Sequence, residues 1–474
     1  MDIIHCNDNL KLYTRELIGG KGYNLLPLYT KAQQSTISSE LYTVPAFFII
    51  PNEFLSYDIS YDPNQIGDYR TIEFTNKKQL DQLIEPFKTL QKPIAVRSSS
   101  PLEDNLEATF AGRFHTELNV TTFEQLIAAA KQVINSQYND TVRDYAAQKE
   151  IAWKEGMAII LQQQIIDAAI QGTIQIEEEE IIIEYYETND SNKKIKQEII
   201  EYDLAKIILD NIIHHNSDFK GEIDTFYKKY NEIISEHFSY IAIAALQAKK
   251  DCNLKETTQI EFLYKPLEKV NFVQIRELPV IKQPSNYEVL NLTIPEGIPS
   301  IESEICNGIA GEMILPAYVT FTPAKANTIA NQFNLKNKIF LNHDLHEMKM
   351  AKKQGYEIRD IFPLSERLWE IGNKLFPEYI LVCNKLDDSI IGMNTITKNK
   401  KAIITTMEAN KTSHAITVAR ELGIIAFGAN LETSDWQQFI YQIQTGDLIH
   451  IKSNGEKAIA YLEKRRESDP YQKD

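Results

Sequence analysis

The sequence predicts a mixed α/β protein built from more than one domain. The chain is 474 residues long, 43% of its residues are hydrophobic, and short apolar runs of strand length alternate with stretches of helical periodicity. Because an ordinary domain holds about 100–200 residues, we expect two to four compact units. Prolines thin out regular structure near residue 283, so we place a first domain at 1–283, a linker at 284–299 and a second domain at 300–474.

The first domain combines strand patterns with helix patterns. The runs "TVPAFFIIP" and "KPIAVRSSS" have the length and apolar content of buried strands, whereas "TFEQLIAAAKQVINSQY" has apolar residues at helical spacing. "MAIILQQQII" and "EEIIIEYYE" are further strand candidates, and Glu177–Glu180 fits a solvated hairpin tip. Residues 205–250 carry long helical patterns, and "TQIEFLYKPLEKVNFVQIRELP" predicts two strands around a charged turn.

The second domain has a different texture, with short strand candidates on either side of a helical region. "EICNGIAGEMILPAYVTF", "YILVCNKL", "KAIITTM" and "LGIIAFGA" are the strand candidates, and residues 323–376 predict two or three short helices. The chain closes with "GDLIHIKSNGEKAIAYL", a hairpin pattern with Asn454-Gly455 at its turn.

The composition limits which partners the protein can bind and in which cellular compartment we expect it. A net charge of −16 argues against a general nucleic-acid surface, although it leaves room for one local basic pocket that holds phosphates. No apolar run is long enough to span a bilayer, and the first residues lack the features of a signal peptide. The four cysteines are far apart, which fits free thiols in a reducing compartment. We therefore expect a cytoplasmic protein without nucleic-acid or membrane partners.

Two stretches of the first domain carry residues suited to phosphate. In "LIGGKGYNLLPLY", Gly20 and its neighbouring glycines let the backbone approach a phosphate, and Lys21 supplies a positive charge. In "AVRSSSPLEDNLEATFAGRFHTELNV", Arg97 offers a planar fork to phosphate oxygens, Ser98 can bond them, and Gly112 lies in a small-residue loop that can fold over a nucleotide.

The same stretches also have purely structural interpretations. A glycine-rich turn with a surface lysine would explain the first, and a salt-bridge cluster would explain the second. Within the second stretch, Glu103 and Asp104 are expected to support Arg97.

A third stretch places oxygen ligands on paired strands. In "QIEFLYKPLEKVNFVQIRELP", Glu261 and Gln274 lie one on each predicted strand, so their side chains can meet if they share a face. Two protein oxygens together with ATP phosphates and water suit Mg²⁺, which rarely has an all-protein cage. Arg276 lies two residues beyond Gln274 and would share its face. An exposed polar sheet face is the alternative.

These three stretches, in this order, resemble the nucleotide-binding domain of the phosphoenolpyruvate synthase and pyruvate phosphate dikinase family. The opening glycine-lysine motif, the "VRSSS…ED…FAG…LNV" block and the closing "E…VQ.R" pair carry the resemblance, which covers roughly residues 10–280. It implies an ATP-grasp fold, ATP and Mg²⁺ as cofactors, and contacts to nucleotide from the residues named above. The family's central glycine-rich stretch has no clear counterpart in "IIIEYYETNDSNKKIKQ", where Glu184 is the candidate nearest the nucleotide.

His414 is the candidate nucleophile. In "NKTSHAITVARELGI", Thr412 or Ser413 can cap a helix and Gly423 can end it, which puts His414 in the first turn. The positive end of the helix dipole disfavours imidazolium, so the ring stays neutral and nucleophilic near neutral pH. A histidine that only shapes the helix end is the alternative.

The His414 stretch is similar to the phosphohistidine swivelling domain of the same family, a β/β/α domain with a Thr-Ser-His signature. The family's glycine pair before the threonine is replaced here by Ala409, Asn410 and Lys411. No stretch resembles the family's pyruvate-binding barrel. A small-molecule acceptor would therefore be handled by residues 323–376 or by a separate protein.

Three functions remain open from the sequence. The first is an ATP-dependent phosphotransferase of the dikinase type, in which Lys21, Arg97 and His414 are catalytic and AMP and phosphate are formed. The second is an ATP-consuming ligase or condensing enzyme that uses the phosphohistidine to activate a substrate. The third is a non-catalytic regulator that has kept the fold.

Overall fold

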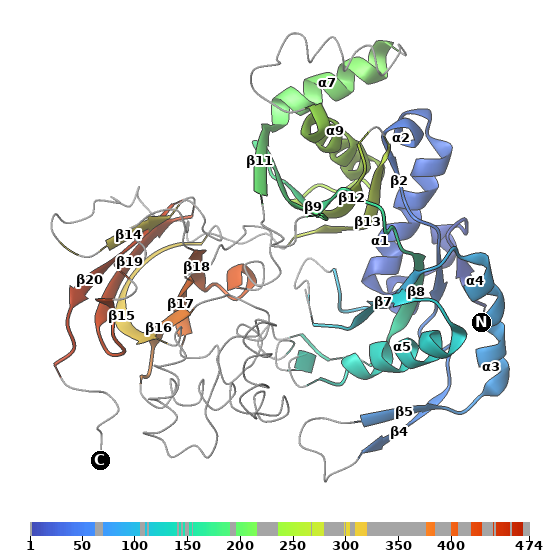
Figure 1. Cartoon of the computed structure of the whole chain (residues 1–474), viewed down its shortest axis with the longest axis horizontal. Helices are drawn as coiled ribbons and strands as arrows, with labels where there is room; N and C mark the ends of the chain where they lie inside the picture. The colour runs from blue at the N-terminus through green and yellow to red at the C-terminus, as the bar shows by residue number, and fades with distance from the viewer. Residues whose placement is uncertain are drawn as a thin grey trace. The chain divides into compact units, whose positions relative to one another are not determined.

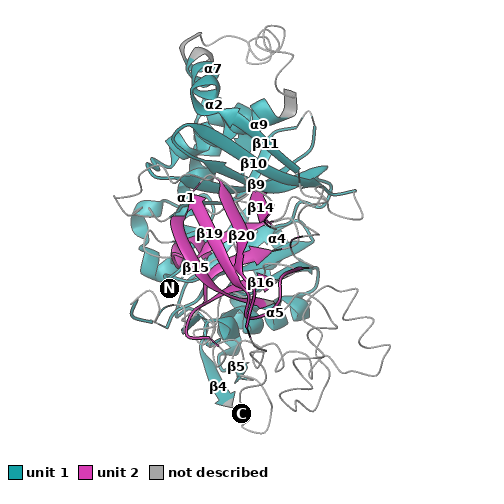
Figure 2. Ribbon diagram, turned by 90° about the vertical axis from the view of Figure 1, so that its left-hand side faces the viewer, with its two compact units in different colours: residues 1–280 teal, residues 281–474 magenta. Residues whose placement is uncertain are grey.

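The structure is a computed structural model that divides into two compact units, residues 1–280 and 281–474 (Figure 1, Figure 2). The described residues are 2–61, 70–104, 110, 113–139, 142, 143, 146, 151–153, 155–189, 196–215, 236–266, 268–278, 298, 300–303, 309–319, 376–383, 400–405, 419–428, 439, 442–455 and 457–467. The predicted linker at 284–299 and helical region at 323–376 lie outside them, apart from residues 298 and 376.

Unit 1 contains two large sheets and a small hairpin. The first sheet is antiparallel throughout. Its strands, in spatial order, are β1 (Ile4–His5), β3 (Phe47–Ile50), β8 (Ala158–Gln163), β6 (Ile94–Ser99) and β7 (Thr116–Val120). The second sheet is antiparallel except at its last pair, β13 with β2. Its strands are β11 (Lys196–Glu201), β10 (Glu180–Glu187), β9 (Ile170–Ile176), β12 (Thr258–Tyr264), β13 (Val270–Glu277) and β2 (Tyr42–Thr43). The hairpin is β4 (Tyr57–Tyr61) with β5 (Arg70–Phe74).

Helices cover these sheets and join them. The helices in the described part of unit 1 are α1 (Arg15–Gln34), α2 (Thr36–Leu41), α3 (Lys77–Gln82), α4 (Ile84–Thr89), α5 (Phe123–Ser136), α7 (Tyr202–His215) and α9 (Glu236–Asp251), with a 3₁₀ turn, η1, at Leu10–Leu12. A capping box between Thr122 and Gln125 starts α5. Helix α1 packs against β6 and β8 of the first sheet and against β13 and β2 of the second. It therefore holds the two sheets together and brings its own side chains to their junction.

Part of the apolar core of unit 1 lies on one face of the second sheet. Alternate residues of its strands, among them Ile174, Ile183 and Ile260, are fully buried in the same cluster as Ile241 and Ala245 of α9. Burial of alternate residues is expected of a strand with one face against a core. The opposite face of this sheet is consequently left for polar side chains.

A glycine kink sets the start of the main part of α1. Gly19 has a φ of 72°, a conformation that favours glycine, and the helix continues from Gly20. A Cβ atom added at Gly19 would lie 1.8 Å from the Ser99 carbonyl oxygen, and one at Gly20 would lie 1.9 Å from the Glu103 carbonyl oxygen. These glycines therefore allow the helix backbone to approach the chain at residues 99–103.

Changing Gly19 to alanine should destabilise unit 1 by at least about 2 kcal/mol, since backbone strain and a backbone clash add. Gly423→Ala is the control, because Gly423 has a φ of 68° but nothing within 4 Å of an added Cβ. It should cost about 1 kcal/mol from strain alone. Urea unfolding with pulsed hydrogen exchange measures the free energy of unfolding of each unit separately. Equal losses in the two variants would contradict the close packing at Gly19.

Unit 2 is built on a seven-stranded mixed sheet. Its strands, in spatial order, are β14 (Ser300–Ser303), β20 (Ala458–Lys464), β19 (Leu448–Asn454), β15 (Ala310–Val319), β16 (Tyr379–Cys383), β17 (Lys400–Thr405) and β18 (Ile425–Gly428). The pairs from β15 to β18 are parallel and the others antiparallel. The closing hairpin is confirmed, with Gly455 at a φ of 95°.

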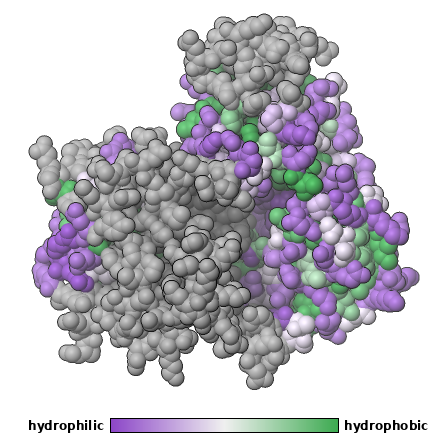
Figure 3. Space-filling view, viewed as in Figure 1, coloured by the Kyte–Doolittle hydropathy of each residue, from purple (hydrophilic) through white to green (hydrophobic). Residues whose placement is uncertain are grey.

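The predicted α/β class is confirmed in both units. The helical pattern expected up to residue 250 appears as α7 and α9, between which residues 216–235 lie outside the described part. No helix in the described ranges is long and apolar enough to cross a membrane. Polar side chains dominate the coloured surface of the face in Figure 3, and apolar ones are scattered among them.

Candidate functional site

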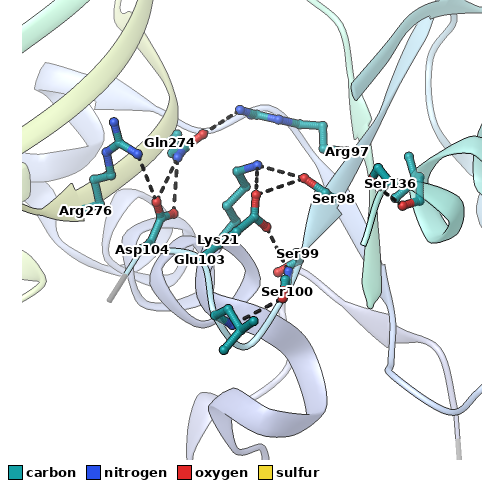
Figure 4. A network of polar contacts seen from close by, with 12 residues as sticks. Lys21, Arg97, Ser98, Ser99, Ser100, Glu103, Asp104, Ser136, Gln274 and Arg276 are labelled. Carbon is teal, nitrogen blue, oxygen red and sulfur yellow. Dashed lines mark hydrogen bonds and ion pairs between the residues drawn. The ribbon is translucent and has the colours of Figure 1, made fainter. Parts of the chain in front are cut away.

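Lys21 lies at the junction of α1 with the loop after β6 (Figure 4). Its Nζ atom donates to Ser98 Oγ over 3.0 Å and to Glu103 Oε1 over 2.7 Å. Ser98 Oγ also donates to Glu103 Oε1 over 3.0 Å, and the backbone N–H of Ser100 donates to Glu103 Oε2 over 2.8 Å. The Lys21 and Glu103 side chains are only 12% and 4% exposed, so this is a buried ion pair.

Arg97 on β6 reaches across to the second sheet. Its Nη1 atom donates to Gln162 Oε1 over 3.0 Å and to the Val273 carbonyl oxygen over 2.6 Å. Its Nη2 atom donates to Glu261 Oε2 over 3.2 Å and to Gln274 Oε1 over 2.9 Å. All four N–H groups on the two terminal nitrogens thus have an acceptor. The guanidinium ties β6 and β8 of one sheet to β12 and β13 of the other.

A β-bulge in β13 brings Glu261 and Gln274 together. Glu261 pairs with Gln274 and Phe262 pairs with Phe272, so Val273 has no partner on β12. Strict alternation would place Gln274 on the same face as Phe272, which is buried in the core. The extra residue reverses this, so Gln274 faces Arg97 while Phe272 and Ile275 both face the core. The Val273 carbonyl bonds Arg97 in place of a ladder partner.

Glu184 joins the same line of residues across four strands. Glu184 is opposite Thr173, Thr173 is opposite Glu261, and Glu261 is opposite Gln274. Directly opposite residues share a face, so the three predicted site residues of this sheet lie in one row. Glu184 is 5% exposed and Gln274 4% exposed. Acidic and amide side chains are rarely buried in a sheet face, as Glu184 and Gln274 are here, so this row is a candidate site.

Arg276 and Asp104 form the far end of the site. Gln274 Nε2 donates to both oxygens of Asp104, over 3.3 and 3.2 Å, and Arg276 Nη1 donates to Asp104 Oδ1 over 3.4 Å. The Arg276 Nε atom donates to Gln259 Oε1 over 2.9 Å. Burial raises the pKa of the Asp104 carboxyl, and the positive charges of Arg276, Lys21 and Arg15 oppose this shift. Burial also lowers the pKa of Arg15, whose guanidinium donates to the Glu103 and Asp104 carbonyls.

The sequence-based role of Glu103 and Asp104 is wrong in one respect. We expected both to support Arg97, but Glu103 binds Lys21, and Asp104 reaches Arg97 only through Gln274. The chain turns sharply after β6, with Asp104 at a φ of 53°, and this carries the two acids toward α1 and β13.

Several polar residues of the site were not predicted. Gln162 and Gln259 bind the two arginines, and Gln175 lies directly opposite Gln259. Their signal was present in the alternation of polar with apolar residues, as in "TIQIE" and "TQIEF", which marks one polar face. Gln162 lies in the apolar run of β8, where no alternation marks it.

The glycines and serines beside Lys21 also bind one another within the protein. The N–H of Gly20 donates to the Ser100 carbonyl over 2.9 Å, and the N–H of Gly22 donates to Ser99 Oγ over 2.9 Å. The backbone on either side of Lys21 is therefore fixed to the serine loop. Gly112 and His414 lie outside the described residues.

The site is chemically suited to a divalent cation and to phosphate. One carboxylate oxygen and one amide oxygen, from Glu261 and Gln274, converge on a single cationic nitrogen of Arg97. Oxygen ligands of this kind suit Mg²⁺. Beside them, Gln162 Nε2 is buried and has no hydrogen-bond partner among the described residues. A buried donor without an acceptor next to a guanidinium fits the oxygen of an anionic ligand.

Comparison with known proteins identifies part of this region. Residues 70–175 match the family model described as the pyruvate phosphate dikinase AMP/ATP-binding domain. A protein of Bacillus subtilis, named as the uncharacterised phosphotransferase YvkC, is 30% identical over 169 residues. That alignment covers 34% of this chain and 19% of the relative, so the chain matches about a fifth of the relative's length.

Similar solved structures are distant. An acetyl-coenzyme A synthetase of Korarchaeum cryptofilum has a TM-score of 0.23 at 8% identity, covering 47% of this chain and 85% of its own. The D-alanine–D-alanine ligase of Bacillus anthracis has a TM-score of 0.19 at 12% identity, covering 48% of this chain and 51% of its own. ATP citrate lyase of Methanothrix soehngenii has a TM-score of 0.27 at 8% identity, covering 89% and 98%. We draw no conclusion from scores this low.

The matched segment contains β6, β7 and β8 of the first sheet and all but the last residue of β9 of the second. Arg97, Ser98 and Gly112 lie within it, and Lys21, Glu261 and Gln274 are joined to it by the contacts described above. Residues 70–175 are therefore similar to the pyruvate phosphate dikinase AMP/ATP-binding domain.

Proposed function

We propose that this protein is an ATP-dependent phosphotransferase that phosphorylates its own His414 and passes the phosphoryl group to a small-molecule acceptor. The observation that supports it most is the gathering of three cations at the junction of the two sheets. Arg97 contacts Glu261 and Gln274, Lys21 contacts Glu103, and Arg276 contacts Asp104, which Gln274 also binds. Three cations at one sheet junction suit the triphosphate of a nucleotide. The match to an AMP/ATP-binding domain over residues 70–175 agrees with this assignment.

In this proposal the nucleotide lies over the polar face of the second sheet. Lys21, Arg97 and Arg276 bind its phosphates, and Gly20, Ser98, Gly112 and Glu184 line its site. Glu261 and Gln274 would hold Mg²⁺, because their oxygens already converge on one cationic nitrogen. When bound there, Mg²⁺ would neutralise charge on the phosphate oxygens.

The proposed reaction begins at His414. Its neutral ring nitrogen attacks the β-phosphorus of ATP, the bond to the α-phosphate oxygen breaks and AMP leaves. Hydrolysis then releases the terminal phosphate, and one phosphoryl group stays on the histidine. Lys21 and Arg97 stabilise the charge that develops on the phosphate oxygens, which is the main contribution a protein makes to phosphoryl transfer.

The phosphoryl group must then reach an acceptor. We propose that residues 300–474 act as a swivelling domain that carries His414, and that residues 284–299 form the linker on which it turns. The acceptor would be bound near residues 323–376 or by a separate protein. The name of the Bacillus subtilis relative, a phosphotransferase, agrees with transfer to an acceptor.

Labelled ATP distinguishes this function from its alternatives. With Mg²⁺ present, label in the β-phosphate should appear on the protein in an acid-labile form, label in the γ-phosphate should appear as free phosphate, and AMP should accumulate. ADP as the only nucleotide product would contradict the dikinase chemistry. Once an acceptor is found, a condensed product without phosphate would indicate a ligase instead.

A further inference from the structure

Every cation proposed to bind phosphate is already paired inside the protein. Lys21 is paired with Glu103, Arg97 with Glu261, and Arg276 with Asp104. Three positive and three negative side chains therefore balance each other in this site. An anionic ligand can bind these cations only if at least one of the internal pairs opens.

Of these pairs, Arg97 with Glu261 is the one most able to open. The Glu261 side chain is 30% exposed, whereas those of Glu103 and Asp104 are 4% and 1% exposed. Water can therefore reach Glu261 when the arginine leaves, but it reaches the other two acids much less. Arg97 has no spare N–H on its terminal nitrogens, so it must release an acceptor before it can bind a phosphate oxygen.

The acceptors that Arg97 would release are the two proposed metal ligands. Its Nη2 atom binds both Glu261 Oε2 and Gln274 Oε1, so the guanidinium holds the place where a cation would be bound. Its Nη1 atom binds Val273 O and Gln162 Oε1, which can keep the side chain anchored while Nη2 moves. A like-charged metal ion cannot share these oxygens with the guanidinium at close range.

We propose that Arg97 is an internal counter-ion that blocks the metal site until nucleotide arrives. The inference rests on the proposed function and adds a regulatory property to the same site. Nucleotide phosphate draws the Nη2 side of Arg97 away from Glu261 and Gln274, and the freed oxygens then accept the divalent cation. By thermodynamic reciprocity, metal bound at Glu261 and Gln274 frees Arg97 for phosphate. Metal and nucleotide therefore bind cooperatively, and each binds weakly alone.

Binding of Mn²⁺, measured by electron paramagnetic resonance of the free ion, tests this without catalysis. The wild type should bind Mn²⁺ weakly alone and at least about 30-fold more tightly with a non-hydrolysable ATP analogue, within the usual range of coupling between sites. Arg97→Met should bind Mn²⁺ alone at least about 10-fold more tightly than the wild type, because the guanidinium no longer competes for Glu261 and Gln274. The further tightening by the analogue should then be clearly smaller than in the wild type, because only coordination by the nucleotide phosphates remains.

Two controls separate this effect from a general change of charge. Lys265→Met removes a cation just after β12 whose ion pairs with Asp167 and Glu268 are exposed, and it should behave as the wild type. Arg97→Met combined with Glu261→Gln should lose the gain in Mn²⁺ affinity. If Arg97→Met does not fold, Arg97→Lys serves, since one ammonium cannot reach all four acceptors and should shift Mn²⁺ affinity in the same direction.

The outcomes distinguish the counter-ion from the function on which it rests. Equal Mn²⁺ affinity of the wild type, Arg97→Met and Lys265→Met without nucleotide, while the analogue still binds the wild type, would overturn the counter-ion and leave the phosphotransferase standing. Arg97 would then be a fixed clamp between the two sheets. Failure of the wild type to bind the analogue with or without Mn²⁺ would overturn both.

Discussion

Changing His414 to asparagine should abolish acid-labile labelling of the protein by β-labelled ATP, a loss of at least about 10⁴-fold. Asparagine keeps a polar side chain at the expected helix start, but its carboxamide nitrogen is not a nucleophile. Binding of the ATP analogue should be unchanged, because the phosphate-binding residues that we propose all lie in unit 1. The measurement is single-turnover labelling at saturating nucleotide.

His450→Asn is the matched control for this variant. His450 is a histidine of unit 2 whose ring nitrogens lie 2.7 Å from Glu312 Oε1 and 2.6 Å from the Tyr461 hydroxyl. It lies on β19, an antiparallel strand, and we assign it no part in the chemistry. His450→Asn should label as the wild type does. Label that persists on His414→Asn at the wild-type rate would rule out His414 as the acceptor of the phosphoryl group.

Changing Lys21 to methionine should reduce phosphohistidine formation by about 100- to 1000-fold, since it removes one preorganised positive charge from the phosphate site. The same change leaves Glu103 buried without its ion-pair partner, which should lower the free energy of unfolding by about 3–5 kcal/mol. Activity and stability therefore fall together in the single variant. Single-turnover labelling and urea unfolding measure the two losses.

A double variant separates the catalytic loss from the structural one. Lys21→Met with Glu103→Gln removes both charges of the pair, and a glutamine can still accept from Ser98 or Ser100. The double variant should regain most of the lost free energy of unfolding, because replacing both partners of a buried pair costs less than removing one. Labelling should stay low. Recovery of both would show that Lys21 acts only as the partner of Glu103.

Local sequence patterns predicted much of the fold. Apolar runs and helical spacing predicted the strands β3, β6, β8 and β10 and the helix α5, since each of these elements has a periodicity that needs no distant partner. The polar face that holds Glu261 could be predicted in the same way, because Glu261 alternates with Ile260 and Phe262 along its strand.

The partners of the charged residues could not be predicted. Lys21 meets Glu103, and Arg97 meets Glu261 and Gln274, because α1 packs against both sheets at once. Such contacts join residues up to 177 positions apart, and no local pattern encodes them. The glycines before Lys21 illustrate the same limit, since glycine permits close approach to any neighbour and their neighbour is the backbone at 99–103.

Val273, the residue of β13 without a partner on β12, affects how this region can change during evolution. Substitutions along the strand alter one side chain at a time and leave every other side chain on its own face. Loss of Val273 would restore strict alternation, turning Gln274 toward the core or Phe272 away from it. Strand length is therefore under a stricter constraint than side-chain identity here. Homologues that keep the site can differ at many positions of β13, but insertions and deletions should be confined to the loops at its two ends.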